Sequence, residues 1–472
     1  MSVEQRETHN RYLSPNQKAF ERFKKNKPSI AGFIVIVIAV LIAIFGYLIA
    51  PDSTPYANDQ VLEIATNSPG FEMEMLQVRK NRPIPKFNFL KKIIGGVENR
   101  YTQIPINSFQ IVGDSVLVDG YTGIKGRTNS ASFHLVDLMY PIKATENITT
   151  TADGYEYFDL DGIKKQASKS ELLAEFDKRG TKKKRYLLGT DKFGRDNLSR
   201  LILGVRVSIS VGLLAALISL IIGLFFGSIA GFYQKSPPKV SIWTIPAVII
   251  AISILIFLWG FPNTLIRILS VLLFPIVVIL LSSLFEKLLS GFWDKKFTLP
   301  VDDMVVWFIN VFWSIPLLLL VFALVLALGR EFWQIYLAVG LTMWVEIARI
   351  VRGQFLSLRE KEFVEASESL GFSDFRTITR HILPNCIGPI IVITAANFAS
   401  AIIIEAGLSF LGIGVQPPQP SWGTMLNEYY QYIGSNKSFL AIIPGLAIMI
   451  LVLAFNLMGN GLRDAFDVKT QL

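Results

Sequence analysis

The chain has 472 residues, of which 51% are hydrophobic and 18% charged, and its formal net charge is +9. The apolar residues are gathered into long uncharged runs, which excludes an ordinary soluble protein and indicates a chain that crosses a membrane several times. The single cysteine, Cys386, excludes an intramolecular disulfide, and the basic groups collect at the ends of the apolar runs, so membrane topology explains the positive charge better than nucleic-acid binding does.

The first apolar run, Ile30–Ala50, has 21 residues and, at about 1.5 Å per residue, is long enough for a hydrocarbon core of roughly 30 Å. It is too long for the apolar part of a signal peptide and lacks a small-residue cleavage site, so we expect a retained first span over residues 29–50. Four basic residues precede it, which places the tail of residues 1–28 in the cytoplasm. These residues are Arg22, Lys24, Lys25 and Lys27.

A hydrophilic stretch of domain size, residues 51–188, follows the first span. Short runs with alternating apolar residues, such as Ser108–Val118, are separated in it by Gly and Asp-Gly turn signals. We therefore predict a small inserted domain that is α+β or mostly β, and the order of spans places it outside the cytoplasm. The basic run Lys182–Arg185 argues weakly against that side, but long loops are translocated largely regardless of charge.

Seven further apolar runs of membrane length follow. They are approximately Val205–Tyr233, Ile242–Gly260, Ile266–Leu284, Val305–Leu328, Phe332–Ala348, Gly388–Leu411 and Phe439–Met458. Together with the first run they predict an all-α polytopic membrane protein of about eight spans with both termini in the cytoplasm. The basic residues of the short loops agree with this orientation. They are Lys235, Lys239, Lys287, Lys295, Lys296, those between Arg349 and His381, and Arg463. A re-entrant or interfacial segment is the alternative for the run Ile242–Gly260.

Residues 357–385 form a charged, patterned segment between two apolar runs, EKEFVEASESLGFSDFRTITRHILP from Glu360 to Pro384. Ser357 and Glu360 fit a capping box at the start of a helix, and Gly371 stands where a left-handed residue ends one. We expect Pro384 to close a second, shorter helix. One face of the first helix carries small and apolar groups, as an element that docks into a groove of another protein requires. This face consists of Phe363, Ala366, Ser367 and Leu370.

The sequence contains little that could carry covalent chemistry. A Walker A loop, H-E-x-x-H, G-x-S-x-G and clustered Cys/His metal spacing are all missing, and the chain has only three histidines. We therefore predict a protein that is not an enzyme and holds no cofactor or metal, and whose action is conformational and driven by a partner.

Three of the acidic residues within or beside the predicted spans are considered as possible sites. Glu405, in AIIIEAGLSFLG, is costly at membrane depth and is either a residue of the pore or, as we prefer, a structural carboxylate paired inside the helix bundle. Asp302 and Asp303 stand at the start of a span, where an interfacial cap is the simpler interpretation.

The segment Gly189–Asp196, GTDKFGRD, is rich in turn-forming residues. We interpret it as a scaffold elbow that holds the next span, with direct contact to a substrate as the alternative. Residues Asn197–Arg200 are expected to begin an amphipathic helix at the outer face of the membrane.

Several of these motifs resemble one family of transporters. Glu365-Ala366-Ser367, Gly371 and Ile382-Leu383-Pro384 resemble the EAA loop of the permeases of ATP-binding-cassette importers. Ser367 stands where that family usually has a second Ala. Five further segments resemble the oligopeptide/dipeptide/nickel branch, and within it the C-type permease subunit. These segments are LGTDKFGRDNLSRLILGVRVS, WVEIARIVRGQ, RHILPN, EAGLSFLGIGVQPPQPSWG and NLMGNGLRDAFD.

The resemblance covers Leu188–Tyr233 and Val301–Asp467, and the chain departs from the family in two places. The C-type subunit normally has six spans, whereas an extra hairpin of two spans is inserted here at about residues 235–300. The family's loop after the first span is also much shorter than residues 51–188. The permease domain would then occupy residues 189–472.

The resemblance implies the permease core of a type I importer, a subunit that forms half of a translocation pathway for peptides in the cell (inner) membrane. Its partners would be a homologous B-type permease, two cytoplasmic ATP-binding subunits that bind the ATP, and an extracytoplasmic substrate-binding protein. The ATPases would dock on Glu365, Ala366, Ser367, Gly371, Leu383 and Pro384. The sequence does not identify the solute carried. A membrane-anchored sensor acting through residues 51–188 is the alternative, and a membrane enzyme that uses Glu405 is a weaker one.

Overall fold

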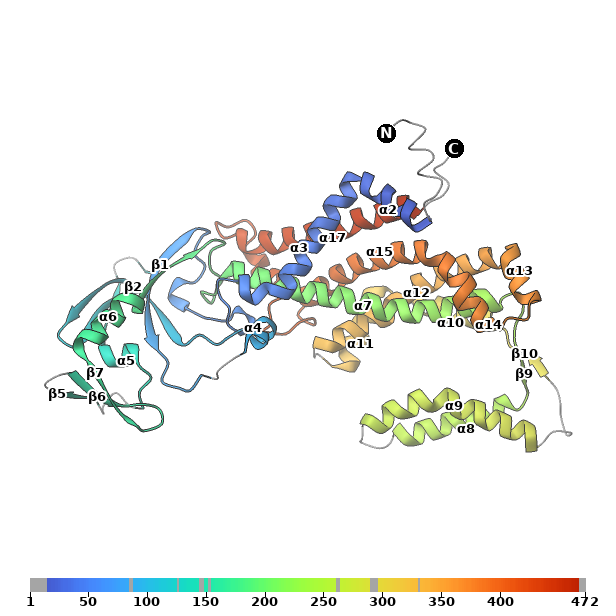
Figure 1. The fold of residues 1–472 in the computed structure, drawn as a ribbon, viewed down its shortest axis with the longest axis horizontal. Helices are drawn as coiled ribbons and strands as arrows, with labels where there is room; N and C mark the ends of the chain where they lie inside the picture. The colour runs from blue at the N-terminus through green and yellow to red at the C-terminus, as the bar shows by residue number, and fades with distance from the viewer. Residues whose placement is uncertain are drawn as a thin grey trace. The chain divides into compact units, whose positions relative to one another are not determined.

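The computed structural model describes most of the chain, and the two compact units into which it divides are treated separately below (Figure 1). The described residues are 15–84, 88–124, 127–143, 148–151, 154–259, 264–288, 296–329 and 332–466. The first unit is Met1–Ser219, Leu317–Met343 and Ile391–Leu472, and the second is Leu220–Pro316 and Trp344–Ile390. Parts of three predictions lie outside the described residues: the tail before residue 15, Lys295 with the loops of the inserted hairpin, and the chain beyond residue 466.

Long apolar helices dominate both units. They are α3 (Lys27–Ile49), α7 (Asn197–Tyr233), α8 (Thr244–Trp259), α9 (Thr264–Leu288), α10 (Val301–Ser314), α11 (Leu317–Leu328), α12 (Phe332–Arg359), α15 (Leu383–Phe410) and α17 (Phe439–Phe466). The shorter helices are α2 (Pro15–Lys25), α4 (Phe89–Gly95), α5 (Leu135–Met139), α6 (Lys169–Arg179), α13 (Glu362–Ser369), α14 (Asp374–Arg376) and α16 (Trp422–Tyr429), with single 3-10 turns at Pro55–Ala57, Leu62–Ile64 and Tyr430–Tyr432.

The described residues contain five helices that are long and apolar enough to cross a membrane, or six if α10 and α11 form one broken span. The predicted single run Val305–Leu328 is interrupted because Pro316 cannot donate a helical hydrogen bond, so the chain leaves the helix at Ile315. Of the two runs in the inserted hairpin, α8 is only 16 residues long. The count therefore stays below the eight expected from hydropathy.

In the first unit, α3 and α17 lie side by side (Figure 1). The hydroxyl of Ser29 donates a hydrogen bond to the carbonyl of Leu457 at 2.9 Å. A Cβ added at Gly32 would lie only 2.6 Å from the carbonyl oxygen of Ala454. Small residues thus let the two backbones approach closely, which is the usual way in which apolar helices pack within a membrane.

An α+β region follows α3 in the same unit. Its strands are β1 (Phe71–Arg79), β2 (Tyr101–Val112), β3 (Ser115–Tyr121), β4 (Thr128–His134), β5 (Thr149–Thr151), β6 (Gly154–Phe158), β7 (Lys164–Ser168) and β8 (Thr181–Tyr186). Five of them form an antiparallel sheet in the order β4-β3-β2-β1-β8, and β5-β6-β7 form a smaller one. One face of β1 buries Leu76 in a core shared with α5 and α6. The opposite face buries Met75 against Val61, Ile64 and Tyr186.

The second unit has an aromatic core around the fully buried Trp344 of α12. The ring of Phe308 stacks on Trp344 at 5.5 Å between centroids, and Phe226 and Phe312 lie at 5.1 and 5.5 Å. The helices α7, α10 and α12 supply these rings, so side-chain packing joins three segments that are far apart in sequence.

The inserted hairpin of α8 and α9 leaves and rejoins the chain at a two-stranded ribbon (Figure 1). The strands are β9 (Lys239–Ser241) and β10 (Lys296–Thr298), which pair antiparallel from Lys239↔Thr298 to Ser241↔Lys296. The two ends of the insertion are therefore adjacent in space.

Three local expectations are wrong. Ser357 lies inside α12, so no capping box forms with Glu360, and α13 begins instead after Lys361 without a side-chain cap. Pro384 does not end a helix, because the π-helical turn Thr377–Ile382 continues through it into α15. Asn197 opens the 37-residue α7 and is buried, so no separate amphipathic helix lies there.

Candidate functional site

The segment expected to dock on a partner forms a helical reversal of the chain in the second unit. It runs from the end of α12 through α13, Gly371 and α14 into a π-helical turn, Thr377–Ile382, that continues as α15. Gly371 has φ +76°, a left-handed conformation that a side chain disfavours, and its N–H donates to the carbonyl of Glu368 at 2.9 Å. The predicted helix–Gly–helix arrangement is therefore present.

The inner face of α13 holds this reversal together. Val364 and Ser367 are buried, and so is Thr377 of the π-helical turn. The hydroxyl of Ser367 donates to the carbonyl of Val364 at 2.8 Å and lies 3.3 Å from the hydroxyl of Thr377. Ser367 therefore faces inward, which corrects its assignment to an exposed docking face.

The outer face of α13 is apolar and exposed. Phe363, Ala366 and Leu370 are spaced i, i+3 and i+7, so they share one side of the helix. Leu370 is 72% exposed, and Phe375 in the following turn is 76% exposed. Glu365 and Pro384 are also exposed, whereas Leu383 is half-buried. Phe375 was missed in the sequence because the docking face was sought on the first helix alone.

Contacts to the turn after α7 fix the orientation of this segment. The Tyr233 hydroxyl donates to Asp374 at 2.9 Å, and Lys235 pairs with Glu360 at 2.7 Å. The hydrogen bond and charge of Lys235 lower the pKa of the exposed Glu360 carboxyl. Arg359 lies 4.3 Å from the Phe232 ring centroid.

Arg359 also pairs with Glu368 at 3.3 Å. These contacts attach both ends of α13 to the end of α7. A force on α13 would therefore be transmitted to the C-terminal end of α7, which lies in the same unit.

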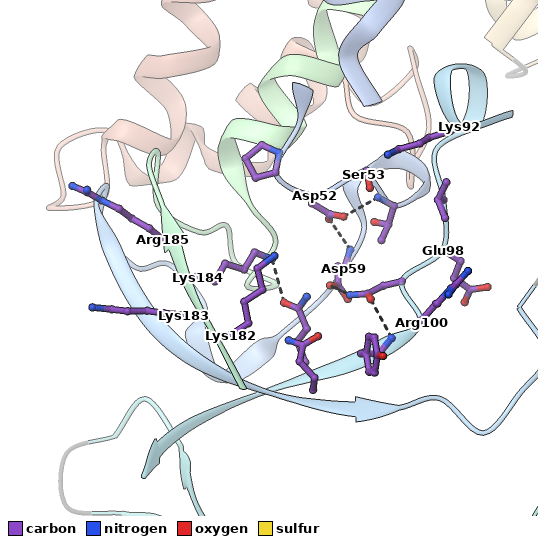
Figure 2. A pocket seen from close by; sticks show the side chains of 17 residues that line it. Asp52, Ser53, Asp59, Lys92, Glu98, Arg100, Lys182, Lys183, Lys184 and Arg185 are labelled. Carbon is purple, nitrogen blue, oxygen red and sulfur yellow. Dashed lines mark hydrogen bonds between the residues drawn. The ribbon is translucent and has the colours of Figure 1, made fainter. Parts of the chain in front are cut away.

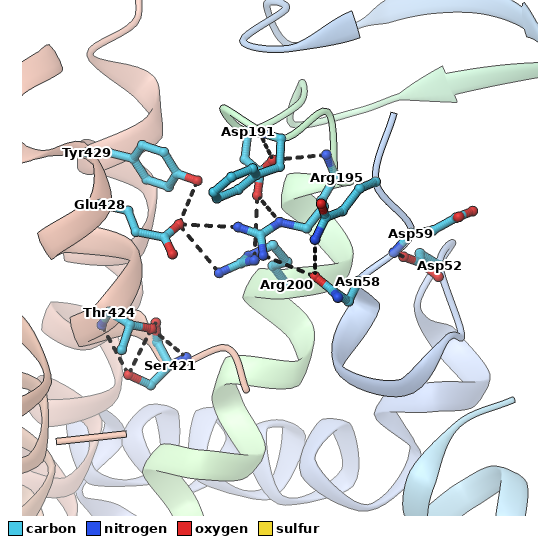
Figure 3. A network of polar contacts seen from close by, with 12 residues as sticks. Asp52, Asn58, Asp59, Asp191, Arg195, Arg200, Ser421, Thr424, Glu428 and Tyr429 are labelled. Atoms are coloured by element: carbon cyan, nitrogen blue, oxygen red, sulfur yellow. Dashed lines mark hydrogen bonds and ion pairs between the residues drawn. The ribbon is translucent and has the colours of Figure 1, made fainter. Parts of the chain in front are cut away.

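The GTDKFGRD segment of the first unit forms a compact polar elbow (Figure 3). The carboxylate of Asp191 accepts hydrogen bonds from the backbone N–H groups of Phe193 and Arg195 at 2.8 and 2.9 Å. Gly194 has φ +71°, and a Cβ there would overlap the carbonyl oxygen of Val61. Asx-type turn bonds and a close backbone approach thus explain why these residue types stand in this order.

Two buried arginines join this elbow to α16 (Figure 3). Arg195 contacts Asp191 at 2.6 Å and Glu428 at 3.3 Å. Arg200 contacts the same two carboxylates at 3.5 and 3.6 Å. The Tyr429 hydroxyl donates to Glu428 at 2.8 Å, and burial raises the pKa of that phenol. Two buried cations thus meet one buried carboxylate and a second that is 15% exposed, an arrangement that favours the scaffold interpretation over substrate contact.

Glu428 was not singled out in the sequence. The motif supplies two carboxylates, but Asp196 accepts from the N–H of Ser199 at 2.9 Å and forms no ion pair with the arginines, so Glu428 supplies their second anion. Its position 233 residues after Arg195 cannot be read from sequence spacing.

Glu405 is fully buried in α15. Its Oε1 accepts a hydrogen bond from the Ser409 hydroxyl one turn later at 2.8 Å, and Oε2 has no partner among the described residues. Asp302 lies in the first turn of α10 in the second unit and makes two parallel bonds of 2.6 Å with Arg352. Within the described residues, no group of three or more His, Cys, Asp or Glu side chains could hold a metal ion.

The sequence matches two described families. Residues 288–471 match "Binding-protein-dependent transport system inner membrane component", and residues 14–69 match "N-terminal TM domain of oligopeptide transport permease C". The first match begins at the last residue of α9, and the second covers α2, α3 and the segment that follows α3.

Similar curated proteins carry the names of peptide permeases. The dipeptide transport system permease protein DppC of Alkalihalophilus pseudofirmus is 33% identical over 281 residues, which cover 60% of this chain and 71% of the relative. The oligopeptide transport system permease protein OppC of Bacillus subtilis is 30% identical, over 61% of this chain and 72% of the relative. The glutathione transport system permease protein GsiD of Pectobacterium atrosepticum is 29% identical, over 67% and 79%.

Proposed function

We propose the following mechanism from the premise that this chain belongs to the binding-protein-dependent permeases of peptide ABC importers. It is a membrane permease subunit of such an importer, embedded in the inner membrane by several spans, and a transport subunit rather than an enzyme. Peptide-permease relatives support this function, and nothing among them supports the alternative of a membrane-anchored sensor.

In our proposal, two cytoplasmic ATP-binding subunits hydrolyse ATP, and a homologous B-type permease completes the pathway. An extracytoplasmic binding protein delivers the solute. Both termini and the reversal of residues 357–385 lie in the cytoplasm, residues 51–188 lie outside, and the inserted hairpin adds two spans to the family's six. Short peptides are the substrate class that the relatives' names suggest.

The exposed apolar face of α13 is the observation that carries the coupling step. Phe363, Ala366 and Leu370, with Phe375 beyond Gly371, would insert into a groove of an ATPase subunit. Glu365 and Pro384 flank this face, Gly371 sets the reversal, and Leu383 connects it to α15. Ser367 takes part from inside, through its contact with Thr377. Burial of apolar surface stabilises such contacts by about 25 cal/mol per Å² before the entropy cost of association.

Coupling then requires that the ATPase subunits bind α13 differently in their open and closed states, because a partner shifts a conformational equilibrium only by its differential affinity. The links from α13 to Tyr233 and Lys235 at the end of α7 carry the movement into the membrane helices. Glu405 and the elbow at Asp191 serve as structural polar clusters in this scheme.

Docking is tested with two separate variants, one with a negative charge on the apolar face of α13 and one with the same charge at an equally exposed leucine elsewhere. Leu370→Glu should abolish co-purification of the ATPase subunits and peptide uptake, because a carboxylate would be desolvated in the groove. Leu288→Glu is the control, since Leu288 is also an exposed leucine of the second unit, 70% exposed against 72%. Normal uptake by the Leu370→Glu complex would refute docking on this face.

A further inference from the structure

A cavity of about 670 Å³ lies between the sheet and the loop that follows α3, entirely within the first unit (Figure 2). Strands β1, β2 and β8 form one wall, and residues 51–54, Asp59 and α4 form the other. No part of this cavity belongs to the reversal of residues 357–385, the proposed coupling segment, or to the polar elbow described above.

The register of the sheet decides which side chains face the cavity. Lys182 and Lys184 pair across from Met75 and Met73 of β1, so they share that face of the sheet with Gln77. Lys183 and Arg185 alternate to the other face, where both contact Glu72, at 2.8 and 3.5 Å. Figure 2 shows the two pairs pointing in opposite directions.

Three of the cations that line the cavity form no ion pair with a carboxylate of the described residues. They are Lys92, Arg100 and Lys182. Lys184 donates to Gln103 at 3.3 Å instead of to an acid.

The three carboxylates of the lining are already engaged. Glu98 pairs with Lys80 and Arg82. Asp52 accepts from the N–H groups of Thr54 and Asp59, and the Asp59 carboxylate accepts from the Asn99 amide at 3.3 Å. The cavity therefore has an excess of positive charge that is open to a ligand.

An unsatisfied hydrogen-bond donor points to the same chemistry. Gln77 is only 7% exposed, and its Nε2 has no partner among the described residues. A buried amide donor without an acceptor costs about 1–3 kcal/mol, so an oxygen acceptor supplied by a ligand would remove that cost. Gln103 lies directly across from Gln77 on β2 and places a second amide beside it.

We propose that this cavity binds short peptides rich in carboxylates, with Lys182, Lys184 and Arg100 contacting the acids and Gln77 donating to a peptide or carboxylate oxygen. This ligand class rests on the proposed function in peptide import. The cavity would hold substrate on the membrane protein itself, in addition to any site on a binding protein.

The experiment measures peptide binding to the assembled complex in nanodiscs of zwitterionic lipid, without a substrate-binding protein. Triglutamate is the probe, trilysine the probe of opposite charge and inorganic phosphate the test for a simple oxyanion site. Lys182→Gln/Lys184→Gln should weaken triglutamate binding at least tenfold, and Arg100→Gln should weaken it in a separate variant. Lys183→Gln, on the opposite face of the same strand, should change it less than twofold.

Equal affinity for triglutamate and trilysine, or an unchanged affinity in the double variant, would overturn the site. Phosphate bound as tightly as triglutamate would overturn the peptide assignment. If the cavity does not bind triglutamate, the complex should still hydrolyse ATP and import peptides, because ATPase docking depends on the coupling segment and not on the cavity. A negative binding result is therefore distinct from failure of the proposed function.

Discussion

Buried charge in the elbow is the residue-scale feature with the clearest energetic consequence. Arg195 and Arg200 are almost fully buried, and Asp191 and Glu428 are the carboxylates that compensate them. Such a cluster gives little net stabilisation while it is intact, but removal of one member leaves an uncompensated charge in a dry environment. The cluster therefore fixes the position of α16 relative to the start of α7.

Glu428→Gln is predicted to lower stability by about 3–5 kcal/mol, the usual cost of breaking a buried ion pair. Thermal unfolding of the purified chain, followed by the exposure of buried tryptophan, measures the loss. Glu72→Gln is the control, because Glu72 makes exposed ion pairs that solvent screens. Equal midpoints for the two variants would contradict the role given to Glu428.

Gly371 is the residue on which the shape of the coupling segment depends. A valine there must adopt φ near +76°, at a cost of about 1–2 kcal/mol, or else change the path of the chain. Gly371→Val should reduce the peptide uptake driven by each ATP hydrolysed while membrane insertion stays normal. Gly353→Val is a suitable control, since Gly353 lies within α12 and a Cβ there would meet no atom within 4 Å. Tight coupling in Gly371→Val would contradict the account.

His134 gives the α+β region a pH dependence. Its Nδ1 accepts the N–H of Val136 at the start of α5, and burial lowers the pKa of the imidazole, opposed by the charges of Asp114 and Asp137. Because the folded pKa lies below the unfolded value of about 6.5, the unfolded chain takes up the proton first. The stability contributed by the neutral His134 is complete above the unfolded pKa and is lost as the pH falls through the folded pKa.

The α5 amides of the full chain should therefore exchange faster as the pH is lowered from about 7.5 to about 5.5, a range centred on the unfolded pKa of about 6.5. The measured rates are first corrected for the intrinsic pH dependence of exchange. His134→Asn keeps a capping oxygen but cannot titrate, so its protection should not vary in that range. The same acceleration in the asparagine variant would assign the effect to another group.

At the scale of elements, the α8–α9 hairpin is an insertion with adjacent ends. Paired residues in an antiparallel ribbon have Cα atoms about 4.5–5.5 Å apart, so a short turn can replace everything between β9 and β10. Replacing residues 240–297 by a short Gly-Ser turn should leave membrane insertion, ATPase binding and peptide uptake near normal. Loss of uptake by an assembled complex would show that the hairpin takes part in transport.

The coupling segment shows what helical periodicity can and cannot predict. Spacing identified α13 and the reversal at Gly371, since both depend on local chemistry. It assigned Ser367 to the outer face because a small residue fits either side of a helix. Its true direction depends on Thr377, which a π-helical turn brings beside it.

At the scale of the whole molecule, long apolar runs predicted most of the membrane helices, because a segment with no charge has few alternatives to a buried or lipid-facing helix. The number of spans was less predictable. Pro316 divides one apolar run into α10 and α11, and hydropathy does not report such a break. The contacts of Arg195 with Glu428 and of Arg352 with Asp302 also depend on tertiary packing, which the spacing of residues in one sequence does not reveal.

Uptake of a radiolabelled dipeptide into proteoliposomes is the most direct test of the central claim. The vesicles would contain this chain with its B-type permease, the two ATPase subunits and the binding protein outside. The account predicts that the dipeptide accumulates in the vesicles only when ATP is present in the lumen, where the ATPase subunits lie. This accumulation should be lost when this chain is omitted or carries Leu370→Glu. Accumulation of the same extent without this chain would contradict it.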